Sequence, residues 1–245
     1  MAIAANQPRP VARADEHRFF LLMTIAMSAT VFVGFSRSFF LRPLFPEWPS
    51  PHEPFFYLHG AVFTLWFVLL VTQAALIGAG RVAAHRALGR FGAVVAAAMV
   101  VLGIVGGIIA AKRPAGFIDV PIPGPQFLIV PVLDMLSFGT LVGFAIARRH
   151  DAQAHKRLML VASMITLAAA IARWPGVHGA GVIVYFLCND LFLIPLIIWD
   201  RRTLGRIHPA TWWGGGWLLL SQPLRLVLAG TPAWLAAANW LTGLV

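Results

Sequence analysis

The chain has little charge, few acids and almost no cysteine. Of its 245 residues, 11% are charged and nine are Asp or Glu, whereas about 25% are charged in an average soluble protein. The one cysteine, Cys188, lies inside an apolar run, which excludes a disulfide framework and a thiolate metal site. Scarce charge, 59% hydrophobic residues and a mean hydropathy of +0.79 together indicate a membrane protein.

Sequence motifs of the common enzyme classes are also missing. The chain has no P-loop, no G-x-S-x-G, no H-E-x-x-H and no C-x-x-C, which excludes an ATP-driven pump and a hydrolase of the soluble type. Whether the chain is an enzyme of another kind stays open. The net charge of +10 comes from Lys and Arg in short clusters between apolar runs. We therefore expect no nucleic-acid partner, because a groove-binding protein gathers its basic residues on one face.

Long apolar runs dominate what the chain does contain. A hydrocarbon core about 30 Å thick requires roughly 20 apolar residues in a helix, which is the open-chain form that satisfies its own backbone in lipid. The sequence predicts an all-α bundle of seven transmembrane helices over residues 19–41, 55–78, 90–111, 125–147, 158–174, 179–199 and 211–230.

The two ends of the chain differ from this transmembrane domain, residues 19–230. Residues 1–18 are polar, contain proline and show no periodicity, so we expect a mobile cytoplasmic tail. Residues 231–245 are apolar and uncharged but too short to span the bilayer. They predict a segment that lies at the membrane interface or packs on the bundle.

The loops indicate an orientation through the positive-inside rule. Five basic residues lie on one side of the expected bundle, namely Arg37, Arg42, Lys112, Arg113 and Arg173. Thirteen lie on the other side, namely Arg9, Arg13, Arg18, Arg81, Arg86, Arg90, Arg148, Arg149, Lys156, Arg157, Arg201, Arg202 and Arg206. The split predicts a cytoplasmic N-terminus and a periplasmic C-terminus in a multi-pass protein of the bacterial inner membrane.

Polar residues inside the expected spans are the best candidates for a site. An ionisable residue at the bilayer centre costs about 2.5–3.5 kcal/mol on insertion scales. The residues concerned are Asp134, Asn189, Asp190, Gln222 and Arg225, with Arg173 at the outer end of its span. Three of these residues are charged and lie within spans, namely Asp134, Asp190 and Arg225. At the helical rise of about 1.5 Å per residue, they reach a similar depth in the membrane. We therefore expect their side chains to meet.

This intramembrane polar cluster has two interpretations. It is either a buried salt bridge that only fixes helix register, or the site of a proton-coupled transporter or small-molecule binding protein. Two carboxylates facing one buried arginine leave one charge over. A proton, a bound cation, His59 or Arg173 must compensate it.

Histidines give a different chemical hypothesis. Haem b in a helical bundle requires two imidazoles at matching depth. His59 begins the second expected span, whereas His85 and His155 lie at the opposite membrane face. As an alternative, His85 and His155 are solvated anchors in basic loops.

Short motifs around these histidines carry a resemblance. His59-Gly60, His85-Arg-x-Leu-Gly-Arg90, His155-Lys-Arg-x-Met159 and Arg173 resemble a widespread group of uncharacterised bacterial multi-pass membrane proteins. The general plan of that group is similar to haem-b transmembrane cytochromes and to small factors of respiratory oxidase assembly, over about half of the chain. The resemblance implies a redox-linked protein with haem b on His59, His85 and His155. It also implies a respiratory-chain or homo-oligomeric partner.

Overall fold

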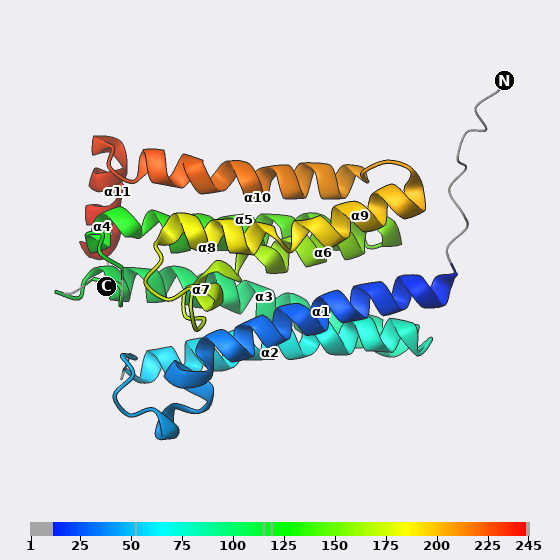
Figure 1. The fold of residues 1–245 in the computed structure, drawn as a ribbon, viewed down its shortest axis with the longest axis horizontal. Coiled ribbons are helices and arrows are strands. Elements are labelled where there is room, and N and C mark those ends of the chain that lie inside the picture. The colour runs from blue at the N-terminus through cyan, green and yellow to red at the C-terminus, as the bar shows by residue number, and fades with distance from the viewer. Residues whose placement is uncertain (1–11, 52, 115, 119, 244–245) are drawn as a thin grey trace.

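The computed structural model describes residues 12–51, 53–114, 116–118 and 120–243, which form helices and contain no strand. Six helical segments are long and apolar enough to cross a membrane, which indicates a multi-pass membrane protein (Figure 1). They are Arg13–Phe40, Pro54–Gly78, Val82–Ala111, Gly124–Ala147, Ala152–Ile171 and Val182–Leu204.

Several of these segments are built from more than one helix. The elements are α1 (Arg13–Phe35), a π turn η1 (Ser36–Phe40), a 3-10 turn η2 (Arg42–Leu44), α2 (Pro54–Gly78), α3 (Val82–Ala111), α4 (Gly124–Phe127), α5 (Ile129–Ala147), α6 (Ala152–Ile165), α7 (Ala168–Ile171), α8 (Val182–Asp190), α9 (Leu193–Leu204), α10 (Pro209–Leu228) and α11 (Pro232–Gly243).

The first helix begins at Arg13 rather than at residue 19, so residues 13–18 of the expected N-terminal tail are helical. Asp15 and Glu16 occupy its first turn, where carboxylates favour the positive end of the helix dipole. Glu16 also forms an ion pair with Lys156 of α6, which ties this turn to the bundle. Residues 1–11 of the expected tail lie outside the described residues.

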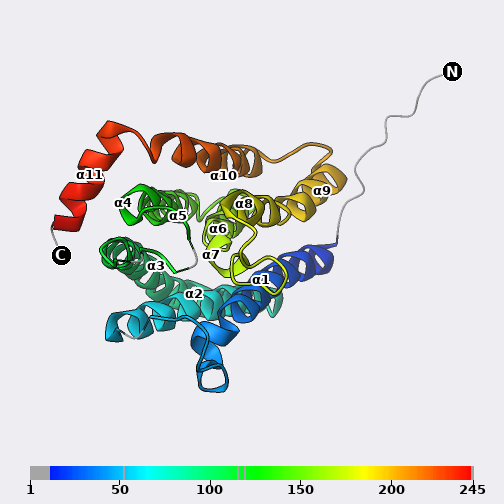
Figure 2. The ribbon, with the colours of Figure 1, turned by 60° about the vertical axis from the view of Figure 1, so that its left-hand side comes forward.

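The C-terminal part contains a long helix and a short one. Helix α10 spans 20 residues and covers most of the seventh expected span, but it is not among the six apolar enough to cross. Helix α11 lies across the end of the bundle and packs on α4 and α3 (Figure 2). The indole of Trp234 donates to the carbonyl of Pro125 at 2.9 Å. Residues 232–243 are thus a packed helix, and this end is named the α11 end below.

Two of the expected spans are interrupted. The fifth is split between α6 and α7 at Thr166 and Leu167, and the sixth between α8 and α9 at Leu191 and Phe192. Pro195 explains the second break, because proline donates no bond to the carbonyl four residues earlier. Interrupted helices inside a membrane occur where backbone is buried in protein or lines a cavity.

Candidate functional site

A cavity lies between α1, α2, α3, α5, α7 and α8 near the α11 end. Its volume is about 320 Å³, and small-molecule sites run from about 300 to 1,000 Å³. The walls are mainly apolar, and they include Phe35, Phe39, Phe63, Phe67, Met135 and Phe186.

Irregular backbone forms part of the cavity wall. The π turn η1 contributes Ser38 and Phe39, and the break between α6 and α7 contributes Thr166 and Ala168. Single π turns inserted in α-helices are frequent at functional sites. The π turn at the end of α1 and the break between α6 and α7 border the same cavity, which favours a binding role for it.

One end of the cavity carries a buried ion pair. Asp134 of α5 lines the cavity and accepts from the guanidinium of Arg225 of α10 at 2.5 Å. The Arg225 side chain is 1% exposed and that of Asp134 is 15% exposed. Arg225 also donates to the carbonyl and hydroxyl of Ser221. The pair is thus well bonded and presents its acidic member to the cavity.

The second carboxylate of the expected cluster has a different partner. Asp190 of α8 accepts from the Gln222 amide at 2.8 Å. Gln222 and Arg225 lie three residues apart on one face of α10, so both pairs belong to one polar layer. The buried Asn189 beside them has no hydrogen-bond partner for its Oδ1 among the described residues. The expected direct meeting of Asp134, Asp190 and Arg225 therefore becomes two separate pairs.

The other end of the cavity is cationic. Arg42, Arg113 and Arg173 all contribute to its lining. The guanidinium of Arg113 forms an ion pair with Glu53 at 2.7 Å, and Arg173 donates to the carbonyl of Ala169 at 2.6 Å. Within the described part of the lining, three arginines and one acid, Asp134, are present, and Glu53 pairs with Arg113 just outside it, so basic side chains outnumber acidic ones. Arg173 thus shares the cavity with Asp134 but lies in its cationic part.

His59 belongs to this cavity as well. Its ring stacks on Phe63 with centroids 4.1 Å apart, and its Nδ1 lies 3.3 Å from the carbonyl of Leu102. The Nδ1 nitrogen therefore donates to that carbonyl. An oriented imidazole at the cavity wall can hydrogen-bond a ligand through its other nitrogen.

His85 and His155 form a separate pair at the opposite end of the bundle. Their ring centroids lie 6.3 Å apart, and Nδ1 of His155 donates to the carbonyl of Ala145 at 2.8 Å. His85 lies near Gln73, which lies fourteen residues after His59 on α2, or about 21 Å at 1.5 Å per residue. A single haem cannot therefore use His59 together with either of the other two.

The pair of His85 and His155 meets only one requirement of a haem site, which is the presence of two ligands. Two neighbouring imidazoles, of which His155 is anchored on a backbone carbonyl, satisfy the ligand requirement. The rings border neither of the two described cavities, so a porphyrin would have to separate them. Within the described residues, no group of three or more His, Cys, Asp or Glu could hold a metal ion.

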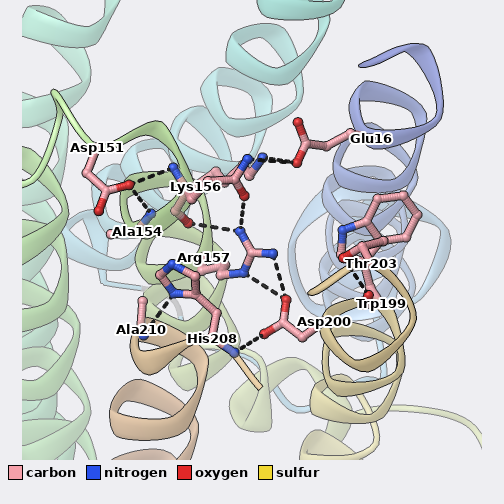
Figure 3. A network of polar contacts seen from close by, with 11 residues as sticks. Glu16, Asp151, Ala154, Lys156, Arg157, Trp199, Asp200, Thr203, His208 and Ala210 are labelled. Carbon is pink, nitrogen blue, oxygen red and sulfur yellow. Dashed lines mark hydrogen bonds and ion pairs between the residues drawn. The ribbon is translucent and has the colours of Figure 1, made fainter. Parts of the chain in front are cut away.

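A second buried ion pair was not expected from the sequence. Arg157, expected in a solvated loop, is buried and bonds Asp200 of α9 at 2.7 and 2.8 Å (Figure 3). The backbone N–H of His208 donates to the other oxygen of Asp200 at 2.9 Å. Arg157 lies three and four residues before the buried Leu160 and Val161, so helical periodicity could have identified its buried face.

Comparison with known proteins gives no family for the chain. No protein-family model, curated protein or solved structure matches it. The resemblance to haem-b cytochromes and oxidase assembly factors therefore stays a proposal based on short motifs.

Proposed function

We propose that the chain is a seven-span protein of the bacterial inner membrane with a cytoplasmic N-terminus. Helix α10 is the seventh span in this proposal, and its Arg225 is compensated by Asp134 inside the bundle. The thirteen basic residues expected in the cytoplasm then face inward, and the cavity opens to the periplasm.

The function that we propose is binding of a small amphipathic anion from the periplasmic side. The observation that carries the proposal is the cavity itself, which joins aromatic walls to a lining in which basic side chains outnumber acidic ones. Apolar walls favour a hydrocarbon or ring body, and arginines favour a carboxylate or phosphate. The Asp134–Arg225 pair closes the deep end as a polar, hydrogen-bonding floor. Proton-coupled transport of the same molecule is the transporter form of this proposal.

Dodecanoate and dodecanol provide the matched probes, because they share one chain length and differ in charge. We expect dodecanoate to raise the melting temperature of the protein in phosphatidylcholine nanodiscs more than dodecanol does. A ligand at a hundred times its Kd stabilises by about 2.7 kcal/mol. Arg173→Gln should reduce the difference between the two probes, because it removes a positive charge from the cavity lining.

Arg81→Gln is the control variant, since Arg81 is exposed just before α3 at the opposite end of the bundle. It removes the same charge and should leave the preference for dodecanoate intact. Equal stabilisation by both probes, or equal loss in both variants, would contradict the proposal.

The paired histidines favour haem binding as a second function. We propose that His85 and His155 would hold the haem, that His59 would not, and that a respiratory-chain protein is the partner. When bound, haem would supply electron transfer, and the carbonyl of Ala145 would orient His155. Expression with excess haem should give a Soret band that disappears in His155→Ala and persists in His59→Ala. A band that depends on His59, or no band at all, would reject this assignment.

A further inference from the structure

A second cavity lies on the outside of the bundle between α5, α6 and α10, at the end opposite to α11. Its volume is about 820 Å³. The lining includes Leu136, Phe144, Trp213 and Trp217, whose side chains are between 38% and 75% exposed. With α10 as the seventh span proposed above, the exposed apolar side chains along α5 and α10 identify an open groove that faces lipid rather than an interior chamber.

One end of this groove is basic. Arg148 follows α5 and Arg206 precedes α10, and both are exposed and line the groove. The other polar groups there are Asp151 and His208. The Asp151 side chain accepts from the backbone N–H groups of Gln153 and Ala154 at 3.0 and 3.1 Å, and His208 Nδ1 accepts from the N–H of Ala210. This end of the groove therefore carries two arginines and one carboxylate, and that carboxylate already caps the N-terminus of α6.

The position of the basic end matches a lipid interface. Trp213 lies four residues after the first residue of α10, or about 6 Å along it, and its side chain is 75% exposed. Tryptophan at this depth is typical of the boundary between headgroups and acyl chains. The arginines thus lie at headgroup level and the apolar walls at acyl-chain level.

We infer that this groove binds one anionic phospholipid of the leaflet at this end of the bundle, which is the cytoplasmic leaflet in the orientation proposed above. The phosphate lies between Arg148 and Arg206, and an acyl chain follows the wall formed by Leu136, Phe144 and Trp217. Basic pockets between transmembrane helices bind anionic headgroups in this way. The inference is independent of the amphipathic anion proposed for the other cavity, because it concerns different residues at the other end of the bundle.

Native mass spectrometry of protein released from micelles with equal phosphatidylglycerol and phosphatidylcholine tests the inference. We expect retained phosphatidylglycerol to exceed phosphatidylcholine. Each arginine near an anionic headgroup contributes roughly a fivefold preference, so Arg148→Gln with Arg206→Gln should abolish most of it. The control pair, Arg201→Gln with Arg202→Gln, removes two exposed charges at the same end outside the groove. It should keep the preference.

A third variant separates a groove from diffuse surface charge. Thr140 is exposed and lines the groove, so Thr140→Trp should fill it without altering charge. We expect this variant to lose retained phosphatidylglycerol. Retention in Thr140→Trp, equal losses in both arginine pairs, or no initial preference would overturn the inference. So would a dimer that dissociates in these variants, because a second copy would then be the occupant.

Discussion

Arg225 shows how a single charged residue is accommodated inside an apolar bundle. Its guanidinium bonds Asp134 and Ser221 and lies 5.4 Å from the ring centroid of Phe186. Removal of one member of a buried ion pair leaves an uncompensated charge, which costs about 3–5 kcal/mol. Apolar replacement of both members is often neutral.

We therefore expect Asp134→Leu and Arg225→Met to destabilise the protein singly and to restore stability together. The free energy of unfolding in a detergent titration measures this. If the pair also forms the cavity floor, the double variant should fold and yet bind dodecanoate less well than the wild type. If the double variant is fully stable and binds dodecanoate as the wild type does, the ion pair only fixes the helix register and has no role in binding.

Arg157 and Asp200 form a second buried ion pair, which lies closer to the membrane surface. Both side chains are at most 1% exposed. We expect Asp200→Asn to destabilise by about 3–5 kcal/mol, since Arg157 stays buried without its anion. Asp15→Asn is the control, because Asp15 is an exposed acid near the start of α1. A similar loss in both variants would show that burial of the pair is not the cause.

His208 predicts a pH dependence of stability. Burial lowers the pKa of His208 from its usual 6.5, and the nearby Arg157 lowers the pKa further. The folded state therefore binds this proton less readily than the unfolded chain does. The contribution of His208 is complete above about pH 6.5 and is lost as the pH falls from there towards the lowered pKa. Protonation also removes the Nδ1 acceptor that caps α10.

His208→Asn should weaken this dependence, because asparagine caps a helix without titrating. Melting temperatures between pH 5 and 8 measure the difference. His150→Asn, at an exposed position, is the control. A slope between pH 5 and 6.5 that is the same in His208→Asn and wild type would contradict the assignment.

Individual residues were only partly predictable from the sequence. The cost of charge in lipid identified Asp134, Asp190 and Arg225 as residues that need partners. The choice of Asp134 for Arg225 and of Gln222 for Asp190 depends on the rotation of α5, α8 and α10 about their axes. Hydropathy carries no information on that rotation. Arg157 and Asp200 were missed because both adjoin basic loops, where burial is not expected.

At the scale of elements, close helix contacts depend on glycine. A side chain at Gly34 of α1 would collide with the backbone carbonyl of Ala170 in α7. We expect Gly34→Ala to destabilise the protein, because backbone atoms cannot move aside as a flexible side chain does. Gly92→Ala in α3 is the control, since no heavy atom lies within 4 Å of the added carbon. It should be neutral or should stabilise by up to about 1 kcal/mol.

Thermal unfolding of the two glycine variants separates the effects of contact and helix propensity. Equal stability changes would show that α1 and α7 do not touch at Gly34. The same contact fixes α7 beside α1 and so helps to position the break at Thr166 that borders the cavity.

Helix boundaries and the number of spans were both predicted only in part, because six of the seven expected runs coincide with segments long and apolar enough to cross a membrane. The apolar runs located six spanning segments, but α1 begins six residues earlier than expected because acidic residues favour its first turn. The breaks at residues 166–167 and 191–192 were not predicted. Pro195 was visible in the sequence, yet a proline can kink a helix without ending it, and the first break has no proline beside it.

For the whole molecule, two cavities lie at opposite ends of one bundle. The one near α11 is lined by aromatic rings and arginines, and the other is a groove on the outer surface of the bundle. The all-helical class and six of the seven expected spans followed from composition and run length. The cavities did not, because they depend on how neighbouring helices separate and on where their backbones are interrupted.

Accessibility of the cavity near α11 tests the central claim most directly. Ala169 lines this cavity and is exposed, whereas Ala162 is buried on the same membrane segment and lies outside the lining. Each position is changed to cysteine after Cys188, the one native cysteine, is changed to alanine. A membrane-impermeant thiol reagent applied to the periplasmic face should label Ala169→Cys, should not label Ala162→Cys, and should react more slowly when dodecanoate is present. Labelling of Ala169→Cys only from the cytoplasmic face, or from neither face, would contradict the account.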